Sequence, residues 1–68
     1  MWKDLPPHKR ALIEELLTDR QLEILKLTID GHTTRTIARH LGLSPSTVHA
    51  HLDRALEKLR PHLGKDAA

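Results

Sequence analysis

The sequence predicts an all-α fold, a small four-helix domain that contains a helix-turn-helix and has no winged elements. Three observations predict it. Apolar residues recur at helical spacing in four successive segments. Gly42 separates the last two segments, and the last one opens with its own capping residue and a proline. The length of 68 residues allows a single domain, which we expect to cover residues 1–68.

The first segment is an amphipathic helix that we expect over residues 7–17. Pro6 and Pro7 leave residues 1–6 as an N-terminal arm, and Pro7 suits the first helical turn because its missing N–H costs nothing there. The apolar side chains of this helix lie on one face and need a surface to pack against. This stripe consists of Leu12, Ile13, Leu16 and Leu17.

The second helix is expected over residues 19–30. Thr18 and Gln21 have the spacing of a capping box, in which each side chain satisfies a backbone N–H of the other residue. Asp19 favours the positive end of the helix dipole. Gly31 can adopt the left-handed conformation that ends a helix.

The helix-turn-helix is expected to consist of helices over residues 34–41 and 45–60. In the first of these, Ile37, Ala38 and Leu41 share one face. After the turn, Ser44 can cap the second helix and Pro45 can begin it. Because a proline disfavours helix in the residue before it, we expect the helix to stop before Pro61 and residues 61–68 to form a tail.

The last helix is predicted to turn one face to the core and to leave the other in solvent. At about 100° per residue, the core face comprises Val48, Leu52, Ala55, Leu56 and Leu59. A major groove about 12 Å wide admits one helix, and only exposed residues near the start of that helix reach base edges. The candidate base-contacting residues are Ser46, His49, Ala50, Asp53 and Arg54. Asp53 has the alternative role of ordering Arg54 or a neighbouring basic side chain.

Candidate phosphate-contacting residues lie at the starts of the two helices and on their flanks. Free backbone N–H groups and the helix dipole favour an anion at a helix start. The candidates are Thr33, Thr34, Arg35, Ser44, Thr47 and Lys58.

Composition argues against several other classes of function. The chain has no cysteine and one aromatic residue, Trp2, so it lacks thiolate metal sites and the stacking platforms of many single-strand binders. The six histidines include no i, i+4 pair. We therefore expect no enzyme, no catalytic residues, no metal and no cofactor. With no apolar segment near the ~20 residues that span a bilayer, we expect a soluble, cytoplasmic protein that binds no membrane.

The stretch Leu17–His51 resembles the LuxR/GerE-type helix-turn-helix. The resemblance implies that His49, Ala50 and Asp53 contact bases. The chain departs from the family pattern at His49, where a lysine is frequent, at Thr36, where an acidic residue is usual, and in residues 61–68, which are too short for the family's dimerisation helix. The matching residues are Leu17, Thr18, Arg20, Glu23, Ile24, Leu25, Leu27, Gly31, Ile37, Ala38, Leu41, Leu43, Ser44, Thr47, Val48 and His51.

The C-terminal part, with Arg54–Arg60 reading RALEKLR, is also similar to region four of bacterial sigma factors. Two hypotheses follow. The first is a sequence-specific transcription regulator from a bacterium or its phage that binds double-stranded DNA through a helix in the major groove. The alternative is a sigma-region-four-like interaction module that binds RNA polymerase or an anti-sigma-type partner through the Leu12, Ile13, Leu16 and Leu17 stripe, which could instead form a homodimer.

Overall fold

The computed structural model describes the backbone of residues 1–67 and the side chains of residues 1–62. Residue 68 of the predicted tail lies outside the described residues. The described chain forms a short 3₁₀ turn, η1 (Trp2–Asp4), and four helices: α1 (Pro7–Leu16), α2 (Asp19–Ile29), α3 (Thr34–Leu41) and α4 (Pro45–Ala67). No strand occurs in this part of the chain, so the prediction of an all-α domain is confirmed. None of these helices is both long enough and apolar enough to cross a membrane.

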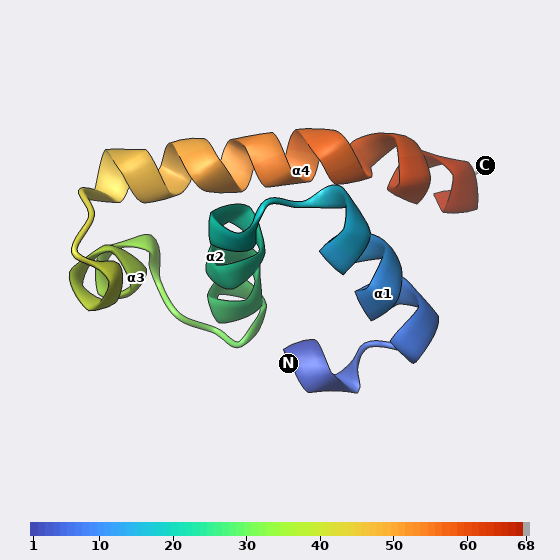
Figure 1. Ribbon diagram of the computed structural model, residues 1–68, viewed down its shortest axis with the longest axis horizontal. Coiled ribbons are helices and arrows are strands. Elements are labelled where there is room, and N and C mark those ends of the chain that lie inside the picture. The colour runs from blue at the N-terminus through green and yellow to red at the C-terminus, as the bar shows by residue number, and fades with distance from the viewer. Residues whose placement is uncertain (68) are drawn as a thin grey trace.

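The long helix α4 organises the fold. It runs along one side of the domain, and α3, α2 and α1 lie in succession along its length (Figure 1). The domain measures 36 × 21 × 19 Å along its principal axes. α3 contacts α4 near the start of α4, whereas α1 contacts it further along, so the two parts of α4 pack against different helices.

Two aliphatic clusters hold the helices on α4. One joins α2 and α3 to the start of α4 through Ile24, Ile37, Ala38 and Val48, whose exposure is 0–2%. The other joins the end of α1 and α2 to the middle of α4 through Leu17, Leu25, Ala55 and Leu59. The first cluster fixes α3 against the beginning of α4, which is the arrangement that a helix-turn-helix requires.

The start of α2 carries the predicted capping box. The Gln21 backbone N–H donates to Thr18 Oγ1, and the Thr18 N–H donates to Gln21 Oε1, each over 3.2 Å. Lys58 Nζ of α4 also donates to Gln21 Oε1 over 2.8 Å, although the two residues are far apart in sequence. The side-chain oxygen of the buried Gln21 therefore accepts two hydrogen bonds, and the second of them links α2 to α4.

Replacing Thr18 with alanine is expected to lower the free energy of unfolding by about 1 kcal/mol, because it removes the oxygen that accepts from the α2 backbone. The measurement is urea denaturation followed by circular dichroism. The Thr18→Ser variant keeps the accepting oxygen and should stay close to the unmodified chain. Equal destabilisation by both substitutions would show that the Thr18 methyl group, rather than the cap, matters.

The turn between α3 and α4 follows the local signals in the sequence. Gly42 has a φ of 71°, in the left-handed region that disfavours residues with a Cβ atom. Ser44 then caps α4 by accepting from the Thr47 backbone N–H over 3.2 Å. At the other end of α3, Thr33 accepts from the Thr36 N–H over 3.2 Å.

The expected end of the last helix is wrong, because α4 continues through Pro61 to Ala67. Pro61 lacks the N–H that would bond the carbonyl of Glu57. Both residues are exposed, so water can hydrogen-bond that carbonyl instead.

The N-terminal arm is also more structured than predicted. The Trp2 backbone N–H donates to Asp30 Oδ1 over 2.7 Å, and Lys26 Nζ lies 5.1 Å from the Trp2 ring centroid.

Two expectations about apolar residues need correction. Leu56 was placed on the core face of α4, but it is 41% exposed because its neighbour Ala55 takes the buried position. The prediction that Leu17 belongs to an exposed docking stripe is wrong, because Leu17 lies in the core. Ile13 and Leu16 pack against the same cluster, which leaves Leu12 as the stripe's exposed member.

Candidate nucleic-acid interface

The first three turns of α4 present a polar face to solvent. Val48 and Ala55, which lie on the opposite side, are completely buried. The predicted base-contacting side chains are all exposed, as the helical spacing requires: Ser46, His49, Ala50, Asp53 and Arg54. The structure thus places these five residues together on a free helix surface.

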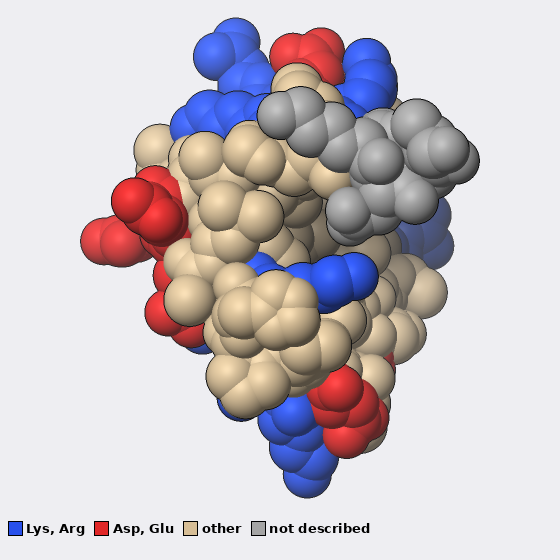
Figure 2. Space-filling model, turned by 90° about the vertical axis from the view of Figure 1, so that its right-hand side faces the viewer, with Lys and Arg blue, Asp and Glu red and all other residues tan. Residues whose placement is uncertain are grey.

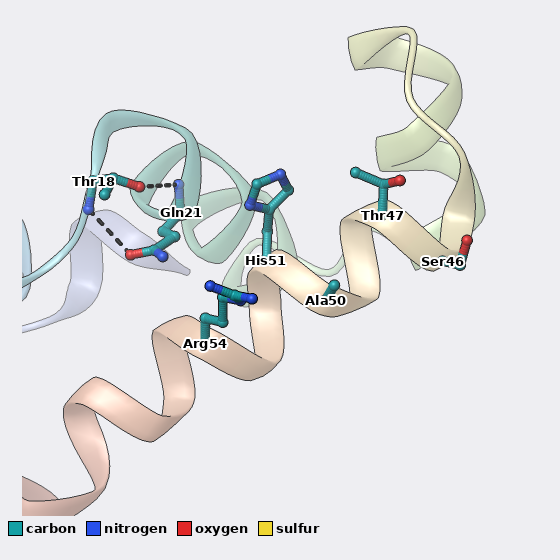
Figure 3. Close-up of a pocket in the computed structure, with 7 residues that line it drawn as sticks. All are labelled: Thr18, Gln21, Ser46, Thr47, Ala50, His51 and Arg54. Atoms are coloured by element: carbon teal, nitrogen blue, oxygen red, sulfur yellow. Dashed lines mark hydrogen bonds between the residues drawn. The ribbon is translucent and has the colours of Figure 1, made fainter.

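Ala50 lies in the middle of this face. Its side chain is a single methyl group, so another surface can approach the α4 backbone closely at this point. Ser46 lies one turn before it and Arg54 one turn after it, and Figure 3 shows all three along the same helix. A small residue flanked by hydrogen-bonding side chains suits a helix that enters a groove.

His49 and Asp53 contact each other on the same face. His49 Nδ1 lies 3.2 Å from Asp53 Oδ2, and the two side chains are 65% and 59% exposed. The alternative role predicted for Asp53, ordering a nearby basic side chain, thus has a structural counterpart, although the partner is His49 and not Arg54. Among the described residues, no three His, Cys, Asp or Glu side chains lie close enough together to hold a metal ion.

The starts of α3 and α4 carry clustered hydroxyl groups. Ser44 Oγ lies 2.8 Å from Thr47 Oγ1 and 3.2 Å from Ser46 Oγ. Thr33 and Arg35 are exposed at the start of α3, whereas Thr34 is half-buried. Thr33 and Ser44 each use their side-chain oxygen as the helix cap, and the Thr33 hydroxyl also donates to Thr36 Oγ1 over 3.0 Å. The backbone N–H groups of the first turns are therefore the groups that remain to meet an anion.

An open hollow of about 480 Å³ lies between the start of α2 and the first turns of α4. In Figure 3, His51 and Arg54 extend from α4 toward the side on which Thr18 and Gln21 begin α2. Among the residues whose side chains are described, none of those lining this hollow is a carboxylate. Its lining residues are Thr18, Gln21, Ser46, Thr47, Ala50, His51 and Arg54.

Sequence reasoning did not find the α2 side of this hollow. Thr18 and Gln21 had a sufficient explanation as a helix cap, and nothing local in the sequence indicates that α2 starts beside α4. The Gln21 to Lys58 hydrogen bond has the same long-range origin. That bond uses one of the three N–H donors of the Lys58 ammonium group, which lies about 18 Å along α4 from Ser46.

The net charge is more positive in the helix-turn-helix half of the chain, because acidic residues are fewer there. Residues 33–62 contain five Lys or Arg and two Asp or Glu, whereas residues 1–32 contain five and six. Figure 2 looks onto the end of the molecule where α1 and the later turns of α4 lie, and there basic and acidic side chains are interspersed over an uncharged surface. The excess of basic over acidic residues in residues 33–62 favours an anion at the helix-turn-helix part of the chain.

Comparison with known proteins gives a consistent result. Residues 15–68 match the family model described as bacterial regulatory proteins, luxR family. The chain is 44% identical over 43 residues to the transcriptional regulatory protein DesR of Bacillus subtilis, covering 63% of this chain and 22% of DesR. It is 46% identical over 48 residues to the uncharacterised response regulatory protein YgeK of Escherichia coli, covering 71% of this chain and 33% of that protein.

A third relative is the transcriptional regulatory protein UhpA of Salmonella typhimurium, which is 41% identical over 46 residues, covering 68% of this chain and 24% of UhpA. The chain thus spans a third or less of the length of these relatives. No solved structure matches it.

Proposed function

This chain belongs to the luxR family of bacterial regulatory proteins, and we propose that it is a DNA-binding domain for transcription regulation that places α4 in the major groove of double-stranded DNA. The observation that carries the proposal is the free face at the start of α4. Ala50 lies at its centre, and Val48 on the opposite side anchors the helix in the core. This arrangement holds the helix rigidly while leaving its outer face available to bases.

Each residue of this face has a base chemistry that fits its position. The Ala50 methyl can contact a thymine methyl group, and its small size lets the helix lie deep in the groove. Ser46 can donate or accept a hydrogen bond, and His49 can reach a base edge with the ring nitrogen that does not face Asp53. Arg54 is one turn beyond Ala50, where it reaches either a base or the backbone. Asp53 contributes to this face through its contact with the His49 ring.

Two flanks of α4 are proposed to meet the phosphate backbone. On one flank, the backbone N–H groups and side chains at the starts of α3 and α4 meet one strand, through Thr33, Thr34, Arg35, Ser44 and Thr47. On the other flank, Arg54 projects along the hollow beside the start of α2. Lys58 lies further along the same side and would join these contacts through an N–H donor that its bond to Gln21 leaves over.

The interaction-module alternative has less support. Its docking surface was the apolar stripe of α1, and three of the four stripe residues pack within the domain. α1 therefore offers no contiguous apolar surface through which RNA polymerase or a second copy of the chain could bind. Leu12 alone is too small a patch for a specific interface.

In vitro selection of duplexes from a random pool tests the proposed function. We expect enrichment of a short motif by the 68-residue chain. The Ala50→Val variant, which keeps an apolar side chain, should enrich a related motif that is altered at one position. A pool that remains random after repeated rounds at low salt would contradict the proposal.

Replacing Arg35 with alanine is expected to weaken binding to every duplex by a similar factor, because a phosphate contact carries no sequence information. The slope of log affinity against log salt concentration should become shallower by about one. Fluorescence anisotropy with a selected and a scrambled duplex measures both quantities. The matched control is Lys9→Ala on α1, which removes one exposed positive charge far from the proposed groove and should leave the slope unchanged.

A further inference from the structure

The contact between His49 and Asp53 has a consequence for base recognition. The two residues are four apart on α4, so their side chains lie one above the other on the exposed face, with 3.2 Å between Nδ1 and the carboxylate oxygen. We propose, on the basis of the function above, that Asp53 is a positioning residue. It holds the His49 ring with Nε2 outward, and the base that His49 selects then depends on whether the ring is charged.

The carboxylate determines which ring nitrogen carries the hydrogen of the neutral imidazole. A lone pair on Nδ1 would face the Asp53 oxygen at 3.2 Å, so the neutral ring is more stable with its hydrogen on Nδ1. Nε2 then offers a lone pair and acts as an acceptor. When the ring gains a proton, Nε2 becomes a donor, and the neighbouring carboxylate stabilises the cation.

These two states read opposite bases. An acceptor at Nε2 matches the amino groups of cytosine and adenine, whereas a donor matches the acceptor atoms of guanine, the N7 atom of adenine and the O4 atom of thymine. At a C·G pair, the acceptor therefore favours cytosine and the donor favours guanine. Cytosine and guanine are the two members of one base pair. Where His49 faces a C·G pair, a change in the charge of His49 therefore inverts the preferred orientation of that pair.

The surroundings of the pair allow this change of charge. The elements packed against this part of α4 are α2 and α3. On their exposed sides, α3 carries Arg35, Arg39 and His40, and α2 carries Asp19, Arg20 and Glu23. Among the described ion pairs, none links these groups to His49 or Asp53, and on α4 itself Arg54 is the next cation. Water screens the pair in the free chain.

The test uses two duplexes that differ only in the orientation of the base pair read by His49. That pair is the position at which the selected motif changes between the 68-residue chain and its His49→Gln variant. Fluorescence anisotropy gives Kd for both duplexes at about pH 5.5 and about pH 8. The ratio of the two Kd values is the readout, because the other five histidines affect both duplexes alike.

We expect the ratio to shift about tenfold toward the guanine orientation at the lower pH. The His49→Gln variant has no titrating group at this position, so its ratio should not change with pH. Asp53→Asn should reduce the shift, and Asp53→Glu, which keeps the carboxylate, should restore part of it.

Three results would overturn the inference in different ways. A ratio that is independent of pH in the unmodified chain refutes the dependence on charge. A full shift that persists in Asp53→Asn refutes the positioning role, because His49 then acts alone. Failure to enrich any duplex at either pH refutes the proposed function itself and this inference with it.

Discussion

Replacing Ala50 with glutamate should weaken duplex binding at least about a hundredfold, the largest effect that we expect from any surface substitution in this chain. The longer side chain prevents close approach of α4 to the groove floor, and its charge is repelled by both phosphate strands. Glutamate is a good helix former, and Ala50 is exposed, so the fold should be retained. Anisotropy with a selected duplex gives the loss of affinity, and circular dichroism checks the helix content.

The matched control for this prediction is Ala11→Glu. Ala11 is exposed on α1, so the substitution adds the same side chain and the same charge at a distance from the proposed groove. It should change affinity only slightly. Similar losses for both variants would show that net charge, rather than the face at Ala50, controls binding.

Replacing Ile24 with alanine should leave much of the chain unfolded at room temperature. Ile24 is completely buried in the cluster that joins α2 and α3 to α4, and such a truncation costs about 2–5 kcal/mol. A domain of this size has about 3–5 kcal/mol of core stabilisation to lose. The loss of helical circular dichroism and a lower urea midpoint would measure the effect.

Leu56→Ala is the informative comparison, because it removes a large aliphatic side chain from α4 that helical spacing had placed in the core. Since Leu56 is 41% exposed, we expect its truncation to change the free energy of unfolding by no more than about 0.5 kcal/mol. If Leu56→Ala destabilised the chain as strongly as Ile24→Ala, the packing of α4 described above would be wrong.

The sequence predicted best the features that depend on neighbouring residues. The bounds of α3 match the expectation because Thr33 and Gly42 carry the start and stop signals themselves. The starts of α2 and α4 also match, since Thr18, Ser44 and Pro45 act on the turn that follows them. The outward face of α4 followed from helical spacing once Val48 was assigned to the core.

Features that depend on distant residues escaped sequence analysis. The docking of Trp2 near the end of α2, the bond from Lys58 to Gln21, and the hollow between α2 and α4 each need the folded arrangement. The continuation of α4 through Pro61 shows that a proline signal is weak where the freed carbonyl can meet water. The contact between His49 and Asp53 is different, because their four-residue spacing was visible in the sequence.

The most direct test of the central claim is a heteronuclear NMR titration of the isotope-labelled chain with a duplex obtained by selection. A groove-bound α4 predicts that the largest amide shifts fall on residues 44–54 and on the start of α3, while α1 is almost unaffected. Shifts that centre on α1 and leave the start of α4 unchanged would contradict the account.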